Sequence, residues 1–482
     1  VITDVASKED GGVFSIGRLE LYGLKQANLD LLKAKDTSDL VELFDRVRIY
    51  DLSIALGTDA GANDISIGAM EFLNFKLSPT MGDKGGDRAG KNDEDHHHAR
   101  GGAKFAQALK GFEFAGFNVK DMKVSFAQEG MDLDMSVADM RLGEIANGSI
   151  GPMAMFDLDY TVHQSAENRA ELAELAGPLA GLLNGPLGEF ISPENTRVVG
   201  KSMIWQGASI EGLLPYLESG ERPPANAANL ISFGAMEAKD MTSYVDGKLA
   251  GTIDLSVLDA IDFAWLIPTR INSYNKGETY HLSAYVPDGQ DAIMKVLTDA
   301  GAETITGESN FLWEYDDKKG AAKFDISGNM PGFADIDFGF NTSGTPLEPI
   351  LAAMDAKQGQ PNSGNMPSGF ESAAFDGFSF TLKDEKLLDV LFGFAGIQMG
   401  QDAAQVRQMA PAFLAMGGAQ LKELTPRATG YISALSGFIT EGGTLSITMT
   451  PSQPVGLEML TTMEDDPAAL IELVNLQVTH SQ

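Results

Sequence analysis

The sequence predicts an α+β fold dominated by β-structure, in which repeated long antiparallel strands form a curved, groove-like sheet with covering helices. Three observations predict it: a short phrase recurs along the chain, polar and apolar residues alternate over long runs, and glycine-containing turn signals separate these runs. Self-similarity indicates a repeated supersecondary unit. Period-two alternation is typical of an antiparallel strand with one polar face. A C-terminal α+β module is expected to complete the chain.

The recurring phrase is a serine, an isoleucine or phenylalanine and a glycine, with leucine or methionine two positions later. We expect each copy to begin a strand after a turn, with the glycine permitting a bend or a close backbone approach. A direct role of the glycines in binding is the alternative. The copies begin at Ser15, Ser66, Ser149 and Ser232.

Alternation and turn signals mark the individual strands. The runs 46–54, 131–137 and 155–162 alternate most clearly, and a hairpin is expected over 310–326. Asn-Gly and Asp-Gly pairs supply the positive φ angles that tight hairpins need. The expected two-residue turns are Glu129-Gly130, Asn147-Gly148, Asp246-Gly247 and Lys276-Gly277.

Helices are expected to cover the sheet. Ala-, Leu- and Glu-rich sequence predicts one over 167–184, and shorter ones are expected within 28–44 and 288–300. In the C-terminal module we expect a strand over 375–382, helices over 385–396, 402–416 and 426–438, a strand over 444–450, a helix opened by Pro467 and a strand over 476–479.

The expected organisation has five parts. The loop and the linker among them are inferred from Gly-, Pro- and charge-rich composition. The parts are an N-terminal β repeat unit with a helix (1–78), a flexible acidic and histidine-bearing loop (79–103), a β-rich repeat region with inserted helices (104–343), a Pro/Gly linker (344–369) and the C-terminal α+β module (370–482).

Charge and composition oppose several classes of partner and chemistry. The 35 Lys and Arg against 68 Asp and Glu give a formal charge of −33, which opposes nucleic acids and anionic membrane surfaces because these are bound through clustered cations. Without cysteine there is no disulfide, thiol catalysis or Cys-ligated metal. No apolar run reaches the about 18–20 residues of a transmembrane helix. A first residue that is Val1 is compatible with a removed signal peptide or anchor, or with a fragment.

Candidate metal-binding and catalytic groups have simpler explanations. His96, His97 and His98 could chelate a metal ion, but a defined site needs ligands on rigid elements, so no metal site is predicted. Phosphate-loop, dinucleotide-binding and hydrolase-elbow motifs are absent from the sequence. The sequence therefore predicts neither an enzyme nor a cofactor.

Pairs of carboxylates two residues apart recur on the expected strands. Such pairs share a face, and they could act as acid and base or hold Ca²⁺. Alternation with apolar residues explains them instead as the solvated face of a sheet. The pairs are Asp132/Asp134, Asp157/Asp159 and Asp335/Asp337.

Methionine and phenylalanine are concentrated near the repeated phrases. Methionine is flexible and polarizable, so it fills cores and also forms adaptable binding surfaces. Both readings stay open: core packing, or a face that receives acyl chains or other hydrophobic cargo. The residues of this candidate cargo face are Met70, Phe72, Phe75, Met153, Met155, Met236 and Met241.

Three segments carry a family resemblance: the repeated Ser-Ile-Gly strands, the hairpin over 307–320 with its Trp-Glu-Tyr sequence before an acidic turn, and the Gly-Gly-Thr-Leu strand with a Pro-containing exit over 438–454. Together they resemble the AsmA-like and YdgA-like group of large extracytoplasmic proteobacterial proteins. The resemblance implies elongated β-sheet grooves and a part in envelope lipid handling, and it assigns no residue-level function. Most of that group have an N-terminal anchoring helix, which this chain lacks.

The expected function is non-enzymatic binding of lipid or another hydrophobic cargo along a Met- and Phe-lined sheet face. The expected location is extracytoplasmic, periplasmic or envelope-associated, in a bacterium. The alternative is a structural or assembly protein of the envelope that acts through contacts with a protein partner. Mass spectrometry of copurifying molecules distinguishes the two, since only the first predicts bound lipid.

Overall fold

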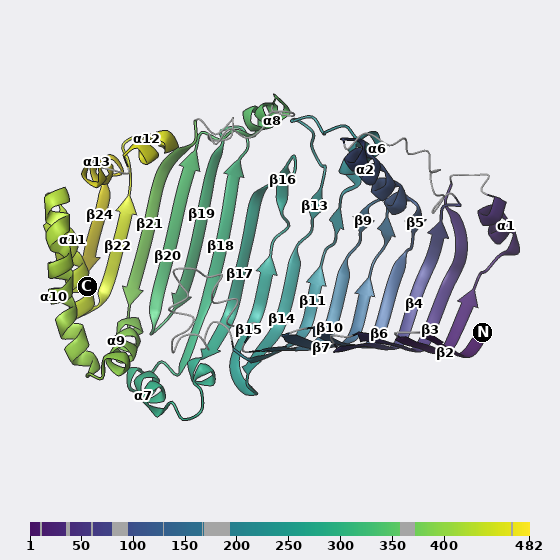
Figure 1. Ribbon diagram of the computed structural model, residues 1–482, viewed down its shortest axis with the longest axis horizontal. Helices are drawn as coiled ribbons and strands as arrows, with labels where there is room; N and C mark the ends of the chain where they lie inside the picture. Colours follow the sequence, from purple (N-terminus) through teal and green to yellow (C-terminus); the bar gives the residue numbers. More distant parts are fainter. Residues whose placement is uncertain are drawn as a thin grey trace. The chain divides into compact units, whose positions relative to one another are not determined.

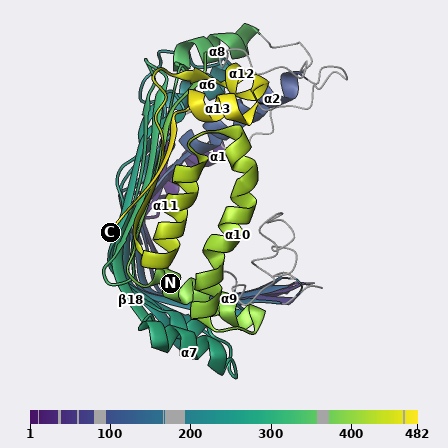
Figure 2. The ribbon, with the colours of Figure 1, turned by 90° about the vertical axis from the view of Figure 1, so that its left-hand side faces the viewer.

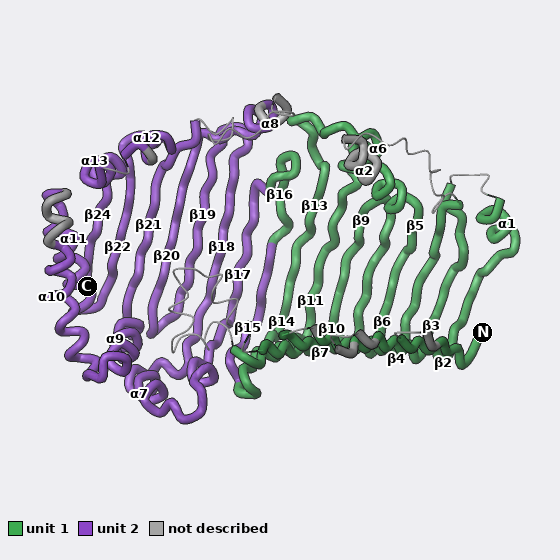
Figure 3. The backbone as a smooth tube through the Cα atoms, viewed as in Figure 1, with its two compact units in different colours: residues 1–248, 259–267 green, residues 249–258, 268–482 purple. Residues whose placement is uncertain are grey.

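The computed structural model describes residues 1–9, 12–34, 39–58, 61–79, 95–128, 130–165, 167, 193–356, 372–463 and 466–482. The chain divides into two compact units (Figure 3): unit 1 comprises residues 1–248 and 259–267, and unit 2 comprises residues 249–258 and 268–482. Strands make up 53% of the structure and the sheet is antiparallel and not closed, so the predicted β-dominated fold class is confirmed. No helix in the described ranges is long and apolar enough to cross a membrane.

Unit 1 is a meander in which each long strand pairs antiparallel with the next (Figure 1). The alternating runs predicted as strands lie in the third, sixth and seventh of its strands. A short strand, β5 (Phe112–Glu113), also pairs with β4. The meander consists of β1 (Ile2–Glu9), β2 (Gly12–Tyr22), β3 (Val41–Thr58), β4 (Gly61–Leu77), β6 (Gly116–Gln128), β7 (Met131–Leu142), β10 (Met153–Gln164), β11 (Asn195–Trp205) and β14 (Met236–Val245).

A second, small sheet in unit 1 divides the four copies of the phrase into two pairs. Ser149 and Ser232 begin short strands of this sheet, as expected. Ser15 and Ser66 instead lie inside β2 and β4, in register with each other through Ser53 of β3. The expectation that every copy begins a strand is therefore wrong for these two. The small sheet has the order β8 (Ile145–Ala146), β9 (Ser149–Ile150), β12 (Ala208–Ser209) and β13 (Ser232–Phe233).

One row of residues crosses the meander where the polar–apolar alternation slips by one position. Five aspartates on alternate strands have positive φ angles of 49° to 57° at equivalent register positions: Asp4, Asp51, Asp121, Asp157 and Asp240. We call them the aspartate row. The strands between them carry Gly17, Gly68, Ala138 and Lys201 at the same level.

The aspartate row changes both the phase and the direction of the strands. Ile49 and Leu52 are three residues apart on either side of Asp51, yet both pack in the same apolar cluster. A residue inserted in the left-handed conformation produces this phase shift and bends the strand. Figure 1 shows the strands of unit 1 turning together near the lower edge of the view.

Three helices accompany the meander: α1 (Gln26–Ala34), α2 (Asp95–Lys110) and α6 (Leu214–Ser219). The α2 and α6 helices pack closely, since a Cβ on Gly102 would lie 3.2 Å from the carbonyl oxygen of Leu217. Lys110 pairs with Glu218 at 2.8 Å. Because α2 begins at Asp95, the expectation of a loop over 79–103 is wrong from residue 95 onward, and His96–His98 belong to this helix. Residues 80–94 lie outside the described residues.

Unit 2 is also antiparallel. Its hairpin over 310–326 is present as β18 and β19, as the sequence predicts. The strands pair in the order β15 (Lys248–Leu258), β17 (Ile267–His281), β18 (Thr304–Asp316), β19 (Ala321–Met330), β20 (Ala334–Ser343), β21 (Ala374–Asp384), β22 (Gly443–Met449) and β24 (Leu476–Ser481), and β23 (Val455–Gly456) pairs with β21.

Helices cover one end of the sheet of unit 2, as Figure 2 shows for α11 and α10. A core cluster joins Leu388 of α9 and Phe438 of α11 to Leu445 of β22. The helices predicted for the C-terminal module are present, although α10 extends further than expected. They are α7 (Asp291–Ala300), α8 (Leu347–Ala356), α9 (Leu387–Met399), α10 (Ala403–Leu424), α11 (Ala428–Glu441), α12 (Leu457–Thr462) and α13 (Pro467–Leu473).

Three sequence-based assignments differ from the structure or lie outside it. Lys276-Gly277 is not a hairpin turn but part of β17, where the register shifts between Asn275 and Glu278. Helix α8 occupies part of the stretch 344–369 that composition predicts as a linker. The helix predicted over 167–184 and the rest of that linker, from 357 onward, lie outside the described residues.

Candidate ligand-binding face

One side of the meander carries three neighbouring cross-strand rows of apolar residues. Residues directly opposite each other in antiparallel strands share a face, and so do residues two positions apart within a strand. Row one is Leu21, Val47, Phe72, Phe117, Leu142, Met153, Trp205 and Met236. Row two is Ile2, Leu19, Ile49, Met70, Val119, Met140, Met155, Met203 and Ala238.

Row three lies on the other side of the aspartate row. It consists of Val5, Ile16, Leu52, Ile67, Met122, Val137, Leu158, Gly200 and Met241. Rows two and three belong to one surface, because Ile16, Leu52 and Ile67 form a single cluster with residues of row two. We call the three rows together the apolar face.

The structure brings six of the seven sequence-predicted cargo residues onto the apolar face. The first row holds Phe72, Met153 and Met236, the second Met70 and Met155, and the third Met241. The seventh, Phe75, lies further along β4 and stacks on Phe44 with a centroid distance of 5.3 Å. All seven are partly buried, so none is lost in a closed core and none is fully exposed.

Burial varies strongly across the apolar face. Val119 and Val137 are 1% exposed, whereas Ile2, at the end of row two, is 50% exposed. Phe72 lies 4.7 Å from Phe117 between ring centroids. The middle of the face near the aspartate row therefore acts as core, and the accessible apolar surface lies toward its margins.

Trp205 is the polar-bearing member of row one. Its ring lies 5.3 Å from Phe233 between centroids. Its Nε1 is buried without a hydrogen-bond partner. An unpaired buried donor is costly, because folding has removed its bond to water without replacing it.

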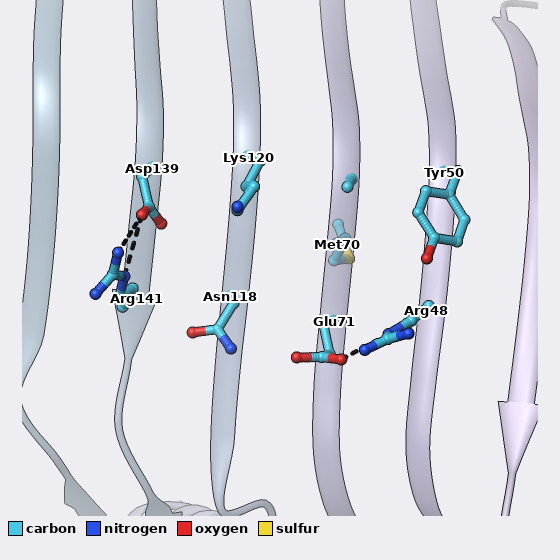
Figure 4. Close-up of a pocket in the computed structure, with 9 residues that line it drawn as sticks. Arg48, Tyr50, Met70, Glu71, Asn118, Lys120, Asp139 and Arg141 are labelled. Atoms are coloured by element: carbon cyan, nitrogen blue, oxygen red, sulfur yellow. Dashed lines mark hydrogen bonds and ion pairs between the residues drawn. The ribbon is translucent and has the colours of Figure 1, made fainter.

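The opposite side of the same strands is polar and charged. A hollow of about 620 Å³ lies there, on β3, β4, β6 and β7 (Figure 4). Arg48 donates to Glu71 at 2.7 Å, and this bond holds the pKa of the Glu71 carboxyl below its usual range. Arg141 pairs with Asp139 at 2.5 Å. The carboxylates of this hollow are therefore already paired with cations of the protein.

The carboxylate pairs noted in the sequence are likewise matched by neighbours. Arg197 donates to both oxygens of Asp159, at 2.9 and 2.7 Å, and the pKa of Asp159 is lowered as a result. Lys383 lies 3.2 Å from Asp335. Asp157 does not share a face with Asp159 as alternation predicts, because it belongs to the aspartate row.

The described histidines outside α2 have ordinary partners. His163 bonds the side chain of Asn195 at 2.7 Å, His281 bonds Thr304 at 3.1 Å, and His480 bonds the carbonyl oxygen of Gly442 at 2.7 Å. Among the residues that the structure describes, no three His, Asp or Glu side chains gather in a way that could hold a metal ion.

Sequence reasoning missed the aspartate row, although a signal for it was present. In each of β2 and β4, apolar residues three apart flank a glycine: Ile16 and Leu19, and Ile67 and Met70. Strict alternation would put such residues on opposite faces. The spacing thus indicated an inserted residue at the glycine level.

Comparison with known proteins gives one match. A family model described as "Uncharacterized protein" matches residues 327–481, which run from β19 to β24 in unit 2. No curated protein matches the chain. The match places the C-terminal region with a family of uncharacterised proteins and does not extend to unit 1.

Proposed function

We propose that the protein is a non-enzymatic, extracytoplasmic envelope protein that binds lipid or another hydrophobic cargo along the apolar face of unit 1. The observation that carries the proposal is the continuity of the three apolar rows across the whole meander. The resemblance to AsmA-like and YdgA-like proteins supports the lipid as cargo and the envelope as location.

The chemistry of the face suits an apolar chain of variable shape. Row two carries Met70, Met140, Met155 and Met203 across the central strands, and methionine side chains adapt to different ligands. Removal of apolar surface from water supplies about 25 cal/mol per Å². The partial exposure of the cargo residues leaves apolar area for a ligand to cover.

Two neighbouring residues of β10 allow a matched test. Met155 lies on the apolar face between Met140 and Met203, whereas Ala154 lies on the polar face opposite Arg141. Uptake of a fluorescent fatty acid by delipidated protein should fall at least tenfold in Met155→Glu and stay close to wild type in Ala154→Glu. Circular dichroism of both variants controls for folding.

The proposal fails if delipidated wild-type protein takes up no lipid and native material carries none by mass spectrometry. It also fails if Ala154→Glu loses as much uptake as Met155→Glu. Fractionation of the native cells tests the location, with recovery in the cytoplasmic fraction as the contrary result.

A second candidate function is a structural or assembly role through protein contacts. The observation that favours it is that β1, at one end of the meander, has a single described partner, β2. Size-exclusion chromatography and native pull-down test it, and a monomer without a partner would count against it.

A further inference from the structure

The end of the meander at β1 is an open sheet edge. In the strand pairings of the described residues, β1 pairs with β2 along Ile2–Glu9 on one side only. Rows two and three end there, at Ile2 and Val5, and Ile2 is 50% exposed. An open edge presents unpaired backbone N–H and C=O groups that can accept another strand.

Bulges and inward charges often protect sheet edges, and Asp4 could be taken for such a device. The interior of the same sheet argues against this. Asp51 has the same left-handed conformation as Asp4, with φ angles of 53° and 57°. Nevertheless β3 pairs on both sides of Asp51, with Gly17 of β2 and Gly68 of β4 at the same level. The conformation of β1 is thus that of a strand with two partners.

The aspartate row also specifies what can lie beside Asp4. A Cβ on Gly17 would lie 3.0 Å from the Cβ of Asp51, and one on Gly68 would lie 3.1 Å from the Cβ of Asp121. Elsewhere in the row the facing residue is Ala138 or the cationic Lys201. The residue that faces an aspartate of this row is therefore small or positively charged.

A second copy of β1 does not meet this requirement. Antiparallel pairing of two β1 strands would place Asp4 beside Asp4, and like charges directly opposite each other destabilise a strand pair. A strand of the β2 type does meet it: Ile16 and Leu19 would extend the apolar rows, and Gly17 would face Asp4.

We propose that the free edge of β1 is a docking site for an extended segment of another protein, which adds to the sheet as a strand with the pattern apolar, glycine, any residue, apolar. Main-chain hydrogen bonds give such strand addition its affinity, and the side chains give it specificity. This inference does not depend on lipid binding by the apolar face.

A synthetic peptide with the sequence of β2, residues 12–22, is the probe. The full-length protein should bind it in a fluorescence anisotropy titration, with hydrogen-exchange protection of the amides of β1. The same peptide carrying Gly17→Glu should bind at least tenfold more weakly, because the added carboxylate meets Asp4. A scrambled peptide controls for composition.

Equal binding of the Gly17→Glu peptide, or binding without protection of β1, would overturn the proposal. So would sedimentation showing that the protein alone dimerises with protection at β1, because a second copy would then occupy the edge. Absence of binding at millimolar peptide would overturn it as well.

Discussion

Asp51 faces Gly17 across β2 and β3, and its side chain lies where a side chain of residue 17 would have to be, with only 3.0 Å between its Cβ and a Cβ built on the glycine. Asp121 and Gly68 repeat the relationship at 3.1 Å. In unit 2 the conformations are exchanged: Gly277 has a φ of 63° and faces Asp254. Asp–Gly pairs across neighbouring strands are thus a recurrent means of shifting strand phase in this protein.

Replacing the glycine of such a pair should destabilise the protein. Gly68→Val adds a branched side chain against Asp121, and overpacking of this kind typically costs about 1–3 kcal/mol. Gly328→Val in β19 is the matched control, because nothing lies within 4 Å of a Cβ at that position. Urea unfolding should show a lower midpoint for Gly68→Val only, and equal midpoints would contradict the steric explanation.

The aspartates of the row should tolerate only residues that accept a positive φ. Asp51 has a φ of 53°, which asparagine and glycine adopt readily and β-branched residues do not. We expect Asp51→Asn to be nearly neutral and Asp51→Ile to lose about 1–2 kcal/mol. Thermal unfolding measures both, and an Asp51→Ile variant as stable as Asp51→Asn would refute the conformational role.

The pair of Glu71 with Arg48 should make stability depend on pH in the acid range. Arg48 lowers the folded-state pKa of Glu71 below the ordinary value of 4.5. A depressed carboxyl pKa stabilises the fold above the unfolded-state pKa, and this contribution disappears as pH falls through the folded-state pKa. The Tm difference between wild type and Glu71→Gln should therefore be largest near neutrality and shrink below about pH 4.5. A difference that stays constant with pH would argue against it.

An aromatic ladder in unit 2 should contribute to its stability. Phe338 makes edge-to-face contacts with Phe324 at 5.7 Å and with Phe378 at 5.4 Å between centroids. Such contacts are worth about 0.5–1.5 kcal/mol each, so Phe338→Leu should cost about 1–3 kcal/mol. Phe340→Leu should cost less, because Phe340 is 39% exposed and makes a single tilted contact, with Phe375. Denaturant midpoints compare the two, and the reverse order would disprove the ladder's role.

If the apolar face binds acyl chains, affinity should rise with chain length. Burial of each additional methylene contributes about 0.8 kcal/mol, or about fourfold in affinity. Displacement of a fluorescent fatty acid by saturated acids of increasing length measures this slope. A flat slope would indicate that the chain is not buried against the protein.

The sequence by itself determined the β-dominated class, the C-terminal helices, the hairpin turns at 147–148 and 246–247, and the apolar character of the strands around Met70 and Met155. These follow from local preferences: alternation, turn residues and capping act within a few positions of the chain. The histidine-bearing stretch was expected to be a loop because composition cannot register the packing of α2 on α6.

Only the tertiary structure decided that six of the seven cargo residues share one face, and that identical phrases at Ser66 and Ser149 lie in different sheets. Register between strands far apart in sequence depends on which aspartate meets which glycine across the sheet. That choice is made by cross-strand contacts, whose effect on phase is visible only when the strands lie side by side.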